Sequence, residues 1–127
     1  MCAGQDGFLV LSGRVQLAQQ RPAEALDSAT RALATATTPL AQADAQRLQG
    51  EAHLALKDFN AALQALKNAY DIDHAAARAD RIWIDLALMS QAYRGLGQQT
   101  LADDAEQRAR LAREAAKPPV AAGAKPS

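Results

Sequence analysis

Apolar and small residues recur with a helical period along most of the chain, and short polar breaks divide this pattern into segments. Such a period gathers apolar side chains on one face of an α-helix. Runs of β-branched or aromatic residues, which favour strands, are nearly absent. The pattern therefore predicts an all-α fold of six helices, at residues 8–19, 22–35, 39–56, 59–75, 80–95 and 99–115.

The breaks between these segments carry residues that begin or end helices. Pro22 suits the first turn of a helix, and Thr38 is an N-cap candidate directly before Pro39. Asp58 is a second N-cap candidate, and Gly95-Leu96-Gly97 is a clear turn. Because these breaks are short, we expect neighbouring helices to pack antiparallel as hairpins.

One hairpin-like segment occurs three times, at residues 11–33, 48–70 and 88–110, which align without gaps. Small residues coincide at the positions where helices must approach closely. These matched sets are Gly13, Gly50 and Ser90; Ala25, Ala62 and Ala102; and Ala32, Ala69 and Ala109. In the last and most polar helix, Glu106 aligns with Leu66, so we expect this helix to be the polar end that a repeat array needs.

The repeat resembles the tetratricopeptide repeat family, whose unit is a helix–turn–helix of about 34 residues. The middle unit is the most similar, with Gly50, His53, Ala62, Leu66 and Ala69 at the family positions. There are departures, since no unit has the Trp of the first helix and the spacings are 37 (Gly13 to Gly50) and 40 (Gly50 to Ser90). The resemblance implies a right-handed solenoid of three antiparallel hairpins over residues 8–116; the alternative is an irregular alanine-rich bundle.

The resemblance also implies a function, because in this family the first helix of each hairpin lines a groove that holds a partner segment. We expect a protein or peptide partner, bound by an adaptor or assembly factor without catalytic activity. The expected groove residues are Val10, Arg14, Leu17, Arg47, Glu51, Leu54, Ile84, Gln91 and Arg94. Leu17, Leu54 and Ile84 would hold the apolar side of the segment, and Arg14, Arg47 and Arg94 its carboxylates. The alternative is a structural module that forms homo-oligomers or ends a larger complex, without a groove.

Charge and motif content exclude several other classes. The 14 basic residues equal the 14 acidic ones, whereas a non-specific nucleic-acid binder needs a net basic surface. His53 and His74 lack the further ligands of a metal site, so no metal or other cofactor is expected. The acidic pairs at residues 71–73 and 103–104 are expected at helix ends or on solvated faces. No phosphate loop or nucleophile–base set is present, and the chain is not expected to be an enzyme.

Both ends of the chain have their own composition. Residues 1–7 are expected to be a flexible lead-in, and the proline- and alanine-rich residues 117–127 a disordered tail. The sequence Cys2-Ala-Gly-Gln resembles the mature start of a bacterial lipoprotein. Two interpretations stay open: a lipid on Cys2 that anchors the protein to the outer membrane in the periplasm, or an ordinary exposed cysteine in the cytoplasm. Membrane attachment is expected only through such a lipid.

Overall fold

The computed structural model describes residues 5–117, and it is all-helical over this range, without a strand. The predicted all-α fold is confirmed for these residues. The six helices are α1 (Gln5–Ala18), α2 (Pro22–Thr35), α3 (Pro39–Ala55), α4 (Phe59–Ala75), α5 (Ala79–Gly95) and α6 (Gln99–Ala116).

One boundary differs from the sequence prediction by more than one residue. Helix α1 begins at Gln5 rather than at residue 8, so residues 5–7 belong to the helix and not to a flexible lead-in. At the other end, Lys117 follows α6 directly and its Nζ lies 2.8 Å from Glu114 Oε2. Residues 118–127, the rest of the predicted tail, lie outside the described residues.

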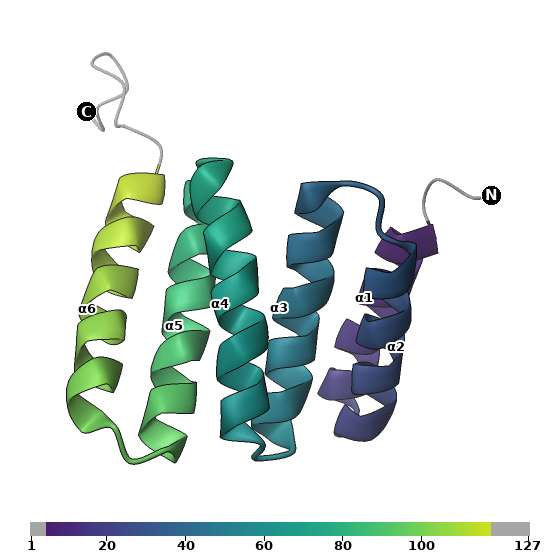
Figure 1. Cartoon of the computed structure of the whole chain (residues 1–127), viewed down its shortest axis with the longest axis horizontal. Coiled ribbons are helices and arrows are strands. Elements are labelled where there is room, and N and C mark those ends of the chain that lie inside the picture. The colour runs from purple at the N-terminus through teal and green to yellow at the C-terminus, as the bar shows by residue number, and fades with distance from the viewer. Residues whose placement is uncertain (1–4, 118–127) are drawn as a thin grey trace, which may run out of the picture.

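The helices stand in a row, each packed against its neighbour in the chain (Figure 1). In addition, α1 contacts α3, and α3 contacts α5, whereas α2, α4 and α6 have no such close contacts with one another. The odd-numbered helices therefore lie closer together than the even-numbered ones. We call the side formed by α1, α3 and α5, where the helices lie closer together, the inner side of the row.

The predicted caps are present. Thr38 Oγ1 accepts a hydrogen bond from the Ala41 N–H at 3.1 Å, and Asp58 Oδ1 accepts one from the Ala61 N–H at 3.3 Å. Pro22 opens α2, where its missing N–H is not needed. These caps satisfy N–H groups that lack partners within the first turn of a helix.

The turns repeat at the level of the backbone. Gln20, Lys57 and Gly97, which occupy the same place in the aligned units, all have left-handed φ angles, of 61°, 62° and 76°. Ala77, in the turn between α4 and α5, has a φ of 56°. In each turn the next residue donates its N–H to the carbonyl five positions earlier, such as Asp58 N–H to His53 O at 2.9 Å, and so closes the helix end.

The matched small residues are buried where helices meet. Ala25, Ala62 and Ala102 are fully buried, each on the second helix of its aligned unit. At Gly50, an added Cβ would lie 2.5 Å from two atoms of the Leu66 side chain. Larger side chains at these places would push the helices apart, so the small residues set the close packing of the row.

Candidate functional site

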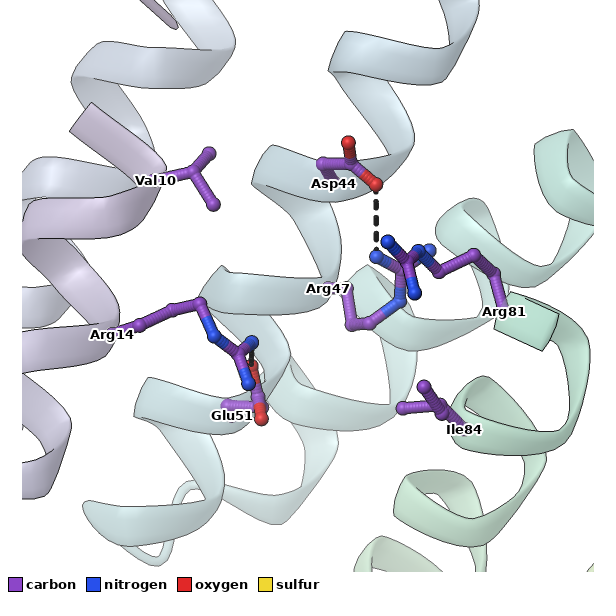
Figure 2. A pocket seen from close by; sticks show the side chains of 7 residues that line it. All are labelled: Val10, Arg14, Asp44, Arg47, Glu51, Arg81 and Ile84. Atoms are coloured by element: carbon purple, nitrogen blue, oxygen red, sulfur yellow. Dashed lines mark hydrogen bonds and ion pairs between the residues drawn. The ribbon is translucent and has the colours of Figure 1, made fainter. Parts of the chain in front are cut away.

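The inner side of the row carries two hollows that share Glu51. The first has a volume of about 300 Å³ and is lined by Val10, Arg14, Asp44, Arg47, Glu51, Arg81 and Ile84 (Figure 2). The second, of about 340 Å³, is lined by Leu17, Glu51, Leu54, Ala55, Leu88 and Gln91. Of the residues predicted for the groove, the structure brings all except Arg94 to one hollow or the other.

The first hollow is charged. Arg14 of α1 and Arg81 of α5 face each other across it, with Glu51 and Asp44 of α3 between them (Figure 2). Arg14 Nη1 lies 3.3 Å from Glu51 Oε1. Within residues 5–117, Arg81 pairs only with Asp80, at 3.6 Å and outside the hollow. Burial raises the pKa of Glu51 above its ordinary value, against the opposing attraction of Arg14 and Arg47. Arg14 and Arg81 thus offer two solvent-accessible cations on opposite walls.

Arg47 forms part of the wall of this hollow, but its charge is engaged within the protein. Its side chain is 7% exposed. Nε donates to Asp85 Oδ1 at 2.7 Å, Nη1 donates to Asp44 Oδ1 at 2.9 Å, and Nη2 donates to Asp73. Arg47 therefore does not present a free cation to a partner, contrary to the role expected for it.

Asp73 and Asp85 are fully buried. The acidic residues at positions 71–73 were expected at a helix end or on a solvated face. Asp71 is exposed and Asp73 lies in the last turn of α4, but the Asp73 side chain is buried, where it meets Arg47. Arg78 adds a second cation, with Nη1 donating to Asp73 Oδ1 at 3.2 Å and Nη2 to Asp44 Oδ1 at 3.4 Å. We call Asp44, Arg47, Asp73, Arg78 and Asp85 the buried charge cluster.

The surroundings of Asp85 in the buried charge cluster favour its neutral form. Burial, together with the neighbouring Asp73 carboxyl, raises the pKa of Asp85 from 3.8 to about 8, although Arg47 opposes the shift. Asp85 Oδ2 has no hydrogen-bond partner among the described residues, whereas Oδ1 accepts from Arg47 Nε. The raised pKa favours the neutral form of Asp85 in this buried setting.

Sequence reasoning missed the buried charge cluster, although one of its members left a signal. Asp85 aligns with Phe8 in the first unit and Ala45 in the second, so a carboxylate replaces apolar residues at one repeat position. A charged residue at such a position calls for a buried partner. No comparable signal marked Asp73 or Asp44.

The second hollow is mainly apolar. Leu17 of α1, Leu54 of α3 and Leu88 of α5 line it, and each of the three is partly exposed. Ile84, which was expected to extend this apolar side, lies instead in the first hollow. The two hollows therefore place an apolar surface beside a pair of accessible arginines.

Arg94 lies apart from both hollows. At the end of α5, it pairs with Glu106 of α6, and its Nη1 lies 3.5 Å from Asp103 Oδ1. Its charge therefore joins α5 to α6 rather than facing the inner side of the row.

Residues 5–117 show no sign of two other kinds of site. No group of three or more His, Cys, Asp or Glu side chains there is arranged to hold a metal ion. None of the helices in this range has both the length and the apolar character needed to cross a membrane. Cys2, the predicted lipid attachment site, lies outside the described residues. Comparisons with protein-family models, curated proteins and solved structures found no match for this chain.

Proposed function

We propose that this chain is a tetratricopeptide-like adaptor that binds a segment of another protein on its inner side and has no catalytic activity. In this proposal the hairpins stack as a right-handed solenoid, with α1, α3 and α5 as the first helices of successive units. The recurring left-handed turn at Gln20, Lys57 and Gly97 supports the repeat. The observation that carries the function is the pair of adjoining hollows, one charged and one apolar, along the three inner helices.

The chemistry of the two hollows defines the segment that would fit. A carboxylate of the partner enters the first hollow between Arg14 and Arg81, and an apolar side chain enters the second against Leu17, Leu54 and Leu88. Arg81 thus takes the role that the sequence assigned to Arg47 and Arg94. Because Arg14 and Arg81 are accessible to solvent, each ion pair would contribute roughly 0–1 kcal/mol.

Burial of apolar surface in the second hollow would supply most of the affinity. It contributes about 25 cal/mol per Å² before the cost of association is subtracted. The arginines would act mainly on orientation and on the rate of association, which salt should slow. A segment that lacks its apolar anchor should therefore bind far more weakly than one that lacks its carboxylate.

A random peptide library displayed on phage tests this function, because it samples partner segments of every composition. We expect the wild-type protein to enrich peptides that combine a carboxylate with an apolar residue. The double variant Leu17→Ser/Leu54→Ser should lose these peptides, while Leu111→Ser, at an exposed leucine of α6, should keep them. Arg81→Glu should weaken binding of the same peptides, and Arg31→Glu, on α2, is its matched control.

Two results would overturn the proposal. One is that no peptide is enriched over a library panned without protein. The other is that the enriched peptides bind the folded double variant as well as the wild type. Circular dichroism of each variant checks that helicity is retained.

A location in the bacterial envelope stays a proposal that rests on Cys2 alone. Mass spectrometry of the protein isolated from its native host measures the state of this residue. A diacylglyceryl group on Cys2 would support the outer-membrane anchor, with envelope assembly as the process served. A free thiol on Cys2 would contradict it and favour the cytoplasmic alternative.

A further inference from the structure

Helix α1 lies at one end of the row (Figure 1). It carries an exposed apolar stripe. Phe8, Leu11 and Val15 are 68%, 62% and 48% exposed. Their spacing places them on one face of the helix. This face is distinct from the one that carries the groove residues Val10, Arg14 and Leu17, which follow their own helical spacing. We call Phe8, Leu11 and Val15 the α1 stripe.

The aligned positions in the other units are buried. Phe8 aligns with Ala45 and Asp85, and Val15 aligns with Ala52 and Ala92, all four of which are fully buried. Leu11 aligns with the buried Leu48 and the half-buried Leu88.

The contacts show which element covers these positions in the second unit. Ala45 packs in a cluster with Leu9 and Ala32 of the first unit. The Leu48 side chain lies so near Gly13 that an added Cβ would be 2.4 Å from its Cδ2. The α1 stripe therefore corresponds to the face of α3 that is buried against the preceding hairpin. Among residues 5–117, no helix covers the stripe itself.

The opposite end of the row has a different character. Asp103, Glu106 and Arg110 of α6 align with Leu63, Leu66 and Tyr70 of α4, which pack in the core around α5. A head-to-tail contact between copies would place these charged groups against the α1 stripe. Burying such charges opposite apolar side chains is costly. The polar end of one copy therefore cannot cover the stripe of another.

We propose that a second copy of this chain covers the α1 stripe, through a two-fold contact between the two α1 helices centred on Leu11. In this arrangement each stripe buries the other, and both polar α6 ends remain in water, so the assembly closes at two copies. The formal net charge of zero gives no overall repulsion between copies. Within the chain, the corresponding face of α3 is likewise buried by helix packing, through Ala45 and Leu48.

Analytical ultracentrifugation of the full chain over a wide concentration range tests the proposal. The wild type should shift from monomer to dimer as its concentration rises. Leu11→Glu and Phe8→Glu should remain monomeric, since each would bury a charge at the contact. Leu111→Glu alters a leucine of α6 with similar exposure, 64%, and should dimerise as the wild type does.

Disulfide trapping tests the two-fold geometry separately. In a Cys2→Ser background, Leu11→Cys should give a disulfide-linked dimer on mild oxidation, and Leu111→Cys should not. A wild type that stays monomeric at all concentrations would overturn the proposal, as would a dimer that Leu11→Glu leaves intact. Because the α1 stripe and the groove use different faces of α1, monomeric Leu11→Glu should still bind the selected peptides. Failure of either proposal can therefore be told from failure of the other.

Discussion

At the scale of single residues, the least ordinary feature is a carboxyl group that is buried and keeps its proton near neutral pH. Asp85 replaces an apolar residue of the repeat and accepts a hydrogen bond from Arg47 Nε. Its charged form is disfavoured by burial and by the nearby Asp73 carboxyl. This arrangement links the stability of the protein to pH.

The pH dependence has a definite sign. Burial and the Asp73 carboxyl raise the pKa of Asp85 in the folded protein from 3.8 to about 8, so the folded state retains this proton over a pH range in which the unfolded chain releases it. Unfolding between these values therefore releases a proton, and the free energy of unfolding should fall as the pH rises through this window. The slope from this group is at most about 1.4 kcal/mol per pH unit. Above the folded pKa, this contribution is fully lost.

The variant Asp85→Asn isolates this effect, because asparagine keeps the acceptor for Arg47 and cannot ionise. Urea unfolding at several pH values should show a shallower fall for the variant than for the wild type. Titrating groups that do not contact Asp85 cancel in the difference between the two proteins. Equal slopes for both would show that Asp85 is ionised in the folded state.

The left-handed turn residues give a second prediction at this scale. Gly97 has a φ of 76°, and an added Cβ there would meet nothing within 4 Å, so Gly97→Ala changes only the backbone preference. This variant should lose about 1 kcal/mol of stability. Ala77, at a φ of 56°, already bears that strain, and Ala77→Gly should gain stability. Thermal unfolding measures both, and shifts of the same sign would contradict the strain argument.

At the scale of elements, the helix starts depend on a few capping side chains. Helix α3 begins with Thr38, whose Oγ1 accepts the Ala41 N–H, followed by Pro39. The cap also sets where the connection from α2 turns into the second hairpin. The last helix has no side-chain cap at Gln98, so α6 depends on its packing against α5.

Thr38→Ala should lower the free energy of unfolding by about 1 kcal/mol, because one N–H of the first turn loses its partner. Thr35→Ala is the control, since the Thr35 hydroxyl only donates back to Arg31 and Ala32 carbonyls within α2. Urea titration of the three proteins compares them directly. A loss at position 35 as large as that at position 38 would argue against the cap.

At the scale of the whole molecule, the buried charge cluster joins three helices that follow one another in the chain, α3, α4 and α5. Arg47 on α3 bonds Asp73 on α4 and Asp85 on α5. Elsewhere the row is joined mainly by alanines and a few larger side chains, such as Leu66 and Met89. The cluster should therefore make α3, α4 and α5 unfold together, as one cooperative unit.

Removing the central cation tests this role. Arg47→Met leaves Asp73 and Asp85 buried without their main partner, and should cost about 3–5 kcal/mol. Arg81→Met removes a partly exposed arginine of the same hollow, and should change stability by less than about 0.5 kcal/mol. Chemical unfolding followed by circular dichroism distinguishes them. A similar, small effect of both variants would show that the cluster does not hold the hairpins together.

The sequence by itself determined the all-helical class, the helix boundaries to within one residue except at the start of α1, and the Thr38 and Asp58 caps. These features depend on local propensity and on contacts a few residues apart, which a periodic pattern records. Leu17, Leu54 and Glu51, which the repeat register places at groove positions, line one hollow together.

Only the tertiary structure decided which charged side chains are buried in ion pairs and which are exposed to solvent. Arg47 and Arg14 are both arginines on inner helices, yet one is buried among aspartates and the other is exposed. The difference arises because Asp73 and Asp85, 26 and 38 residues away in the chain, meet Arg47 when α4 and α5 pack on α3. Such long-range pairing leaves little trace in local periodicity, since charged residues at helical spacing look alike whether they face water or one another.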